Sequence, residues 1–211
     1  VVDKAHQNPI AMSLLSRARL LFIARYPERF TKRLFAELRG DSDKQGYSAF
    51  WNALGKHFFS MDFKKADYLS GVSNKNFIAE LMPRYPIYVP TLPEDAQECI
   101  GVIHQDSEQV ANILLEEGFV FRDYIDPFDA GPTIEAKIDD LKTVSEQRQG
   151  KAFVDPNFSS EESYLVAAGH LSDFRVTCAQ AEPQVAGLVM NEDIQERLSI
   201  HSGSLIQWSK L

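Results

Sequence analysis

A change of residue pattern near Ser145 constrains the fold more than any other feature of the sequence. Upstream of it, segments with the helical spacing of apolar residues alternate with strand-like runs, whereas downstream short strand-like runs are separated by polar breaks. The pattern therefore predicts the α+β class, with a mixed sheet and flanking helices over residues 1–146 and a small β-rich subdomain over residues 147–211. The division falls in the polar stretch of residues 145–151.

The individual segments predict particular elements. Residues 8–25 have the pattern of a helix, with Asn8 as its N-cap, Pro9 at the first helical position and arginines covering its surface. Residues 32–38 are expected to form a mostly buried strand. Further helices are expected over residues 64–69, 75–81, 94–100 and 191–198, and further strands over residues 119–124, 133–138, 163–168, 174–179, 185–190 and 204–208.

Two segments share one design, in which a capped helix stops at a glycine and an aromatic stretch follows. The first helix is expected to end at Gly55 and the second at Gly118. The design indicates either an internal repeat or the ordinary order of elements in a protein of helices and strands. Between the two segments, four prolines in residues 82–93 impose an extended chain.

Composition excludes several classes of protein. The 211 residues are enough to bury a core without disulfides or metal ions. The 22 Lys and Arg against 30 Asp and Glu give a net charge of −8, which argues against a broad grip on nucleic acid. No apolar run approaches the roughly 18 residues of a membrane-spanning helix, and the start does not have the form of a signal peptide. We expect neither a nucleic-acid nor a membrane partner.

Cysteines and histidines do not form a pattern typical of a metal or redox site. Cys99 and Cys178 are far apart and are expected to be buried free thiols, and the five histidines lack metal-ligand spacing. We therefore expect no metal and no permanently bound cofactor. His57 lies in an aromatic stretch and is expected to pack there.

His104 is the candidate for chemistry. It follows an apolar run and precedes a helix that Asp106 or Ser107 would cap, so it lies at the end of an element, where side chains reach into clefts. An imidazole with an ordinary pKa of about 6.5 exchanges protons near neutral pH. The alternative is a hydrogen-bonded loop histidine.

Three long segments carry a resemblance to a known family. They are residues 58–71, residues 77–88 and residues 124–133 (Tyr-Ile-Asp-Pro-Phe-Asp-Ala-Gly-Pro-Thr), and they resemble arginine N-succinyltransferases. The resemblance implies a Gcn5-related N-acyltransferase-like fold in a cytoplasmic enzyme of arginine catabolism. It also implies transfer of a succinyl group from succinyl-CoA, as co-substrate, to the α-amino group of L-arginine. Ornithine stays open as an acceptor.

The resemblance also assigns residues. The family's G-x-V-H motif corresponds to residues 101–104, which read Gly-Val-Ile-His with isoleucine in place of valine, and this makes His104 the expected proton donor. The CoA-binding loop of such acyltransferases corresponds to residues 7–12, where Gln7 and Ala11 are the expected contacts although Ile10 and Met12 replace both glycines. Carboxylates available in or near the family-like segments for a guanidinium group are Glu80, Asp129 and Glu135.

The family is longer at its N-terminus than this sequence, which begins at Val1 without a methionine. We therefore expect a C-terminal fragment of an alpha-type chain that is inactive by itself. Partners implied by the family are further copies of the chain or a related beta chain. The alternative function, motivated by the lost glycines, is a non-catalytic chain that stabilises a catalytic beta chain.

Overall fold

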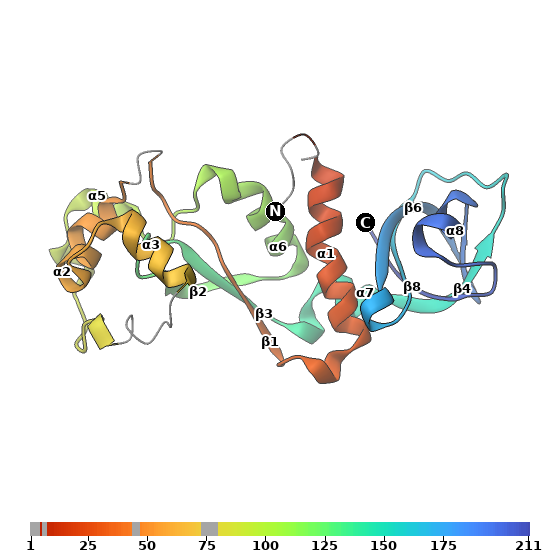
Figure 1. Cartoon of the computed structure of the whole chain (residues 1–211), viewed down its shortest axis with the longest axis horizontal. Helices are drawn as coiled ribbons and strands as arrows, with labels where there is room; N and C mark the ends of the chain where they lie inside the picture. The colour runs from red at the N-terminus through yellow and green to blue at the C-terminus, as the bar shows by residue number, and fades with distance from the viewer. Residues whose placement is uncertain (1–4, 6–7, 44–46, 73–79) are drawn as a thin grey trace. The chain divides into compact units, whose positions relative to one another are not determined.

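A computed structural model describes Ala5 and residues 8–43, 47–72 and 80–211 (Figure 1). The described chain forms two compact units. The barrel unit comprises Val1–Leu34, Ile113–Gly118 and Ala136–Leu211, and the sheet unit comprises Phe35–Asn112 and Phe119–Glu135. Both classes of element are present, so the α+β class is confirmed. The expected division between residues 146 and 147 stays a prediction.

The barrel unit contains a closed barrel of five strands, coloured from cyan to blue in Figure 1. Its order is β4-β7-β6-β5-β8; β4 and β7 are parallel, and every other pair is antiparallel. Its core combines small alanine side chains with larger apolar ones, among them the buried rings of Tyr164 and Trp208, as the interior of a small barrel requires. The strands are β4 (Arg148–Val154), β5 (Ser163–Ala168), β6 (Arg175–Gln184), β7 (Gly187–Met190) and β8 (Leu205–Lys210).

The barrel unit also contains helical segments. They are α1 (Pro9–Arg25), η2 (Pro27–Arg29), η6 (Ile138–Asp140), α7 (Lys142–Glu146), η7 (Leu171–Asp173) and α8 (Asp193–Leu198). Of these, α1, α7 and α8 contact the barrel strands. In α1, the Asn8 side chain accepts the Ala11 N–H as predicted for an N-cap, and Leu21 packs against Leu165 and Ala167 of β5. None of the helices that the structure describes is long and apolar enough to cross a membrane.

Arg17 does not cover the surface of α1 as expected. It is 7% exposed, and its Nε lies 2.6 Å from Glu117 Oε1 and donates to Thr143 Oγ1 at 2.9 Å. Glu117 also accepts the main-chain and side-chain hydrogen bonds of Thr143. The periodicity of α1 predicted the helix correctly but could not indicate a buried carboxylate from a segment one hundred residues away.

The sheet unit is built on a three-stranded sheet of order β1-β3-β2, with β1 (Arg33–Glu37), β2 (Val120–Ile125) and β3 (Pro132–Lys137). β2 and β3 are antiparallel, with a bulge between Phe121 and Tyr124. The expectation that β1 is mostly buried is wrong, because every second residue is exposed and Phe35 is 62% exposed. β1 lies at an edge of the sheet, where a strand has a neighbour on one side only.

The helical segments of the sheet unit are η3 (Trp51–Gly55), α2 (Lys56–Phe59), α3 (Phe63–Val72), η4 (Val89–Thr91), α5 (Glu94–Glu98), η5 (Gln105–Ser107) and, shared with the barrel unit, α6 (Glu108–Glu117). Gly118, with φ 108°, follows the end of α6 as predicted. Gly55 does not end its helix: its φ is −56°, and the helix continues to Ser60 at φ 50°. A Cβ at Gly55 would lie 2.2 Å from the Trp51 ring, so this glycine makes room for packing.

Other element predictions hold in part. The expected helix over residues 75–81 lies largely outside the described residues, and that over 94–100 ends at Glu98. β4 was not expected, because Arg148, Gln149 and Lys151 at its start lack an apolar alternation. Its inward positions near Gly150 and Ala152 are small instead, as the interior of a tight barrel requires.

Candidate active site around His104

His104 lies at the start of the short η5 helix, as the sequence predicted for an element end. Its main-chain N–H donates to the Arg39 carbonyl at 2.8 Å, which attaches the histidine to the segment that follows β1. The Gly101 N–H donates to the Ala130 carbonyl at 2.9 Å, which attaches the same loop to the turn before β3. The loop is therefore held at both ends by main-chain hydrogen bonds within the sheet unit.

The imidazole of His104 is packed, with 10% of the side chain exposed. Its Nδ1 accepts a hydrogen bond from the Asp106 main-chain N–H at 3.1 Å. The Asp106 carboxylate oxygen Oδ2 is 3.7 Å from the same nitrogen, and that side chain is 76% exposed. Nε2 makes no hydrogen bond or ion pair with any residue that the structure describes.

The turn of residues 126–131 is anchored by an aromatic core. Trp51 stacks against Phe59 and against Phe128, with 5.4 Å between ring centroids in each pair (interplanar angles 30° and 21°), and Phe59 and Phe128 also contact each other at 5.5 Å. Phe128 is 6% exposed, and Asp126 and Asp129 flank it in the sequence. Burial of one ring thus determines where two carboxylates lie.

Asp129, an expected substrate ligand, holds main-chain groups in place. Its Oδ2 accepts the Gly40 N–H at 2.8 Å and its Oδ1 accepts the Gly131 N–H at 2.9 Å. A Cβ at Gly131 would lie 2.1 Å from the Leu38 carbonyl oxygen, so the two segments approach too closely for any side chain. Asp129 therefore ties the end of β1 to this turn.

A cavity of about 450 Å³ lies beside this junction. Its walls carry three carboxylates and one cation, and its lining residues are Glu37, Leu38, Arg39, Phe63, Asp126 and Asp129. Burial raises the pKa of Asp126, the negative charges of Asp129 and Glu37 raise it further, and a hydrogen bond from the Phe128 N–H opposes the rise. His104 does not line the cavity; it is attached to Arg39 in its wall.

Sequence reasoning missed Asp126 and Glu37. Asp126 could have been found, because it stands three residues before Asp129 in the family-like segment of residues 124–133. Glu37 has no comparable signal, since only the pairing of β1 with β3 brings it to this cavity.

The other predicted site residues lie away from this cavity. Glu135, on β3, is 7% exposed and forms an ion pair with Arg122 of β2 at 3.1 Å, and Glu80 is exposed. Gln7 lies outside the described residues, and the Ala11 main-chain N–H is bonded to the Asn8 side chain at 2.8 Å. The structure therefore brings Asp129 and His104 to one junction and places the other candidates elsewhere.

The described residues contain no group of three or more His, Cys, Asp or Glu arranged to hold a metal ion. Both cysteines are free, but only Cys99 is buried; the expectation that Cys178 is buried as well is wrong, because Cys178, on β6, is only half-buried. Burial raises the pKa of the Cys99 thiol, and the Asp41 carboxylate adds to the rise; burial also raises the pKa of Cys178. Neither thiol has the lowered pKa of a reactive cysteine.

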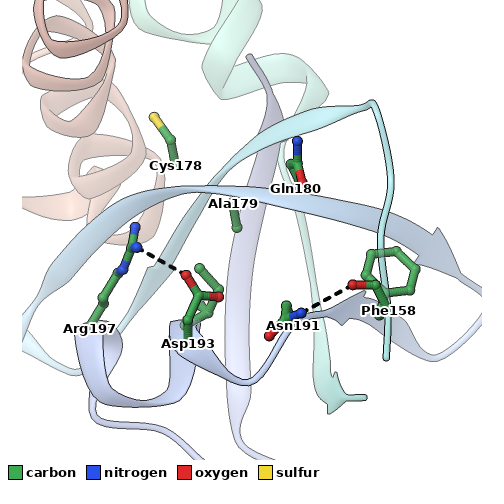
Figure 2. A pocket seen from close by; sticks show the side chains of 8 residues that line it. Phe158, Cys178, Ala179, Gln180, Asn191, Asp193 and Arg197 are labelled. Carbon is green, nitrogen blue, oxygen red and sulfur yellow. Dashed lines mark hydrogen bonds and ion pairs between the residues drawn. The ribbon is translucent and has the colours of Figure 1, made fainter. Parts of the chain in front are cut away.

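A second cavity, of about 370 Å³, lies in the barrel unit against α8 (Figure 2). Its two charged side chains, Arg197 and Asp193, form an ion pair at 3.0 Å, and the Asn191 amide donates to the Phe158 carbonyl at 3.2 Å. Figure 2 shows Cys178 and Gln180 pointing the opposite way from Ala179 between them, as alternation along β6 requires. We assign no chemistry to this cavity.

The chain is thus a mixed α+β protein that joins a three-stranded sheet, carrying a histidine and an acidic cavity, to a closed five-stranded barrel. It belongs to the arginine N-succinyltransferase family. The family model "Arginine N-succinyltransferase beta subunit" matches residues 1–143, and the model of that subunit's C-terminal domain matches residues 152–210.

Individual relatives agree with this membership. The chain is 42% identical over 202 residues to arginine N-succinyltransferase subunit beta of Pseudomonas aeruginosa and 40% identical over 199 residues to arginine N-succinyltransferase of Escherichia coli. These matches cover 96% and 94% of the chain but 59% and 58% of the relatives. The chain therefore spans about three fifths of the length of the curated relatives it matches.

A solved structure has the same fold. Arginine/ornithine succinyltransferase subunit AI from Pseudomonas aeruginosa superimposes with a TM-score of 0.82 at 35% identity, covering 93% of this chain and 56% of that one. The family models and the Pseudomonas aeruginosa relative carry the name of a beta subunit and the solved structure that of a subunit AI, so the expectation of an alpha-type chain stays a prediction.

Proposed function

We propose that this chain is part of an arginine N-succinyltransferase, which transfers a succinyl group from succinyl-CoA to the α-amino group of L-arginine. The observation that carries the proposal is family membership over nearly the whole chain, together with His104 held by a hydrogen bond at the motif position. The Gcn5-related fold, the cytoplasmic location and assembly with further copies or a related chain belong to the same proposal.

The reaction joins an amine to a thioester carbonyl. The neutral α-amine of arginine attacks the carbonyl carbon, a C–N bond forms, the C–S bond breaks, and the nitrogen loses one proton. The departing thiolate has a pKa near that of a cysteine, about 8.5, so a hydrogen-bond or proton donor lowers the barrier to its departure. We assign this donor role to His104.

The proposal is tested by replacing His104 in the protein as its own cells make it. The protein is purified together with any partner chain. His104→Ala, which leaves no side-chain donor, should lower kcat by about 10²–10⁴-fold, the usual contribution of a positioned donor, with little change in KM for succinyl-CoA. His57→Ala is the matched control: the expectation that His57 packs in the aromatic stretch is wrong, because His57 is exposed on α2. A kcat for His104→Ala equal to that of the control would contradict the donor assignment.

The acidic cavity is the candidate subsite for the arginine guanidinium. Asp129 is committed to two main-chain N–H groups, which leaves Asp126 and Glu37 as the carboxylates to bind a cation. Asp126→Asn should raise KM for arginine by about 10–100-fold, since a hydrogen bond to a charged group contributes about 1.5–3 kcal/mol. KM for succinyl-CoA is the internal control, and an unchanged KM for arginine would place the guanidinium elsewhere.

The Gln7 and Ala11 contacts with CoA remain predictions. At this helix start the Ala11 N–H is already used by the Asn8 cap, so a phosphate would have to compete with that side chain. Calorimetry with succinyl-CoA separates the enzyme from the alternative of a non-catalytic chain. Binding to the isolated chain favours a catalytic role, and heat released only when a related chain is added favours the supporting role.

A further inference from the structure

The hydrogen bond at Nδ1 of His104 determines which ring nitrogen carries the proton. The Asp106 main-chain N–H, 3.1 Å away, is a donor at every ordinary pH, so Nδ1 must accept with its lone pair. We propose that the Asp106 main chain holds His104 as the neutral tautomer with its proton on Nε2, and that the ring meets the reacting group as a hydrogen-bond donor through Nε2. Only the identity of the reacting group rests on the proposed function.

Two groups of Asp106 lie near Nδ1, and they favour different tautomers. A proton on Nδ1 would suit the carboxylate, but Oδ2 is 3.7 Å away, beyond hydrogen-bond distance, on a side chain that is 76% exposed. The main-chain N–H is within bonding distance and is fixed in direction by η5. The tautomer with a lone pair on Nδ1 and a proton on Nε2 is therefore favoured.

The loop geometry keeps the ring in this position. The His104 N–H is bonded to the Arg39 carbonyl, and the His104 carbonyl accepts the Ser107 N–H, both at 2.8 Å. The hydrogen bond to Nδ1 is thus one of three that His104 makes, two of them within the turn and one to the segment after β1. Asp106 acts on the ring through its main chain, so it is a positioning residue and not a catalytic one.

Nε2 remains open to a ligand. It has no hydrogen-bond partner among the described residues. It is nevertheless reached by solvent, because the fully buried side-chain atoms without a partner in the described chain are Ser16 Oγ, Gln147 Oε1 and Gln207 Oε1. An N–H without a protein partner at a position that solvent reaches is the form a ligand-binding donor takes.

The tautomer narrows the chemical role of the histidine. Complete loss of the Nε2 proton from a neutral ring would leave an imidazolate, which is far too basic to form here. The ring therefore shares this proton as negative charge develops on the carbonyl oxygen or the leaving sulfur, which is a preorganised electrostatic stabilisation. The proton that the thiolate finally gains is the one that the attacking nitrogen loses, so the reaction balances without a net change in His104.

Nitrogen NMR of the whole chain labelled with ¹⁵N-histidine tests the proposal. At about pH 8, above the ordinary histidine pKa of about 6.5, all neutral rings report their tautomer directly. His57 and His201 are exposed and show the free mixture of tautomers in the same spectrum, and His104→Gln identifies the signals of His104. We expect His104 to be protonated on Nε2 alone. A mixture equal to that of the two references, or a proton on Nδ1, overturns the proposal.

A proline pair tests the role of Asp106. Asp106→Pro removes the donor N–H, whereas Gln105→Pro places proline in the same turn and keeps that N–H; the extended backbone of His104 (φ −60°, ψ 138°) suits a residue before proline. Asp106→Pro should move the His104 signals to the reference mixture, and Gln105→Pro should not. Signals unchanged in a folded Asp106→Pro overturn the role of Asp106; if that variant does not fold, the unmodified chain decides.

The kinetic and spectroscopic results are separable. A normal kcat for His104→Ala together with an Nε2 proton would reject the catalytic role but retain the tautomer. A reduced kcat together with an Nδ1 proton would do the reverse. In the active protein, Asp106→Pro should lower kcat more than Gln105→Pro while KM stays similar, as expected for an effect on the transition state.

Discussion

At the scale of single residues, the most demanding interaction is the buried ion pair of Arg17 and Glu117. Both side chains are less than a tenth exposed, and Thr143 supplies two further hydrogen bonds to the carboxylate. A charge in such a place is stabilised only by its partners, because water cannot reach it. The ion pair itself adds little to the free energy of unfolding, but removal of one partner costs much, because it leaves a buried charge unpaired.

Glu117→Gln should accordingly destabilise the barrel unit by about 3–5 kcal/mol, because it strands the Arg17 charge. Urea unfolding measures this in a Trp51→Phe background, where Trp208 of the barrel unit is the remaining tryptophan. Asp193→Asn breaks the exposed pair with Arg197 and should cost about 0–1 kcal/mol. Equal losses in the two variants would show that the buried pair has no special weight.

At the scale of elements, the site depends on the contact between the end of β1 and the turn of residues 126–131. Leu38 N–H donates to the Pro132 carbonyl at 3.1 Å, Gly40 N–H donates to Asp129, and the histidine loop is bonded to Arg39 between them. Three segments far apart in the sequence thus meet along three consecutive residues. Their register places the cavity carboxylates.

Gly131→Ala should disrupt this contact, because the added Cβ would lie 2.1 Å from the Leu38 oxygen and 2.5 Å from the Gly40 nitrogen. We expect a loss of about 1–3 kcal/mol, typical of overpacking, and faster hydrogen exchange of the Gly40 amide. Gly203→Ala is the control, since its φ of +92° is strained but no atom lies within 4 Å. Unchanged exchange at Gly40 in Gly131→Ala would mean that the turn adapts without releasing β1.

At the scale of the whole molecule, the strongest pH effect belongs to the barrel. Burial raises the pKa of Tyr164 to about 12 from 10.0, helped by its hydrogen bond to Glu162, while the Arg148 charge opposes the rise. The unfolded chain therefore releases the Tyr164 proton first. The stability that the neutral phenol contributes is complete below pH 10 and is lost as the pH rises to about 12.

Tyr164→Phe should remove this part of the alkaline dependence. The difference in thermal midpoint between the original chain and the variant should be constant below pH 10 and shrink towards pH 12. Tyr124→Phe changes an exposed phenol and should leave the slope as it is. Identical slopes for Tyr164→Phe and the original chain would place the alkaline loss on other groups.

Much of the element content follows from local pattern. The cap at Asn8 and Pro9 predicted α1, and Gly118 predicted the end of α6, because capping and left-handed glycine are short-range effects. The mistaken stop at Gly55 has the opposite cause. That glycine serves a tertiary contact with Trp51, and a glycine chosen for packing looks the same in sequence as one chosen for its φ.

The features of the candidate site likewise divide into those that follow from local sequence and those that depend on tertiary contacts. The sequence by itself determined the α+β class, the family and the position of His104 at the end of an element, since these depend on neighbours along the chain. The tertiary structure alone decided that Asp129 holds Gly40 and Gly131, that Asp126 and Glu37 share its cavity, and that Nδ1 of His104 accepts from Asp106. These facts depend on strand pairing and on the buried Phe128 ring. Such contacts join residues far apart in the sequence, and no local pattern indicates which distant residues will meet.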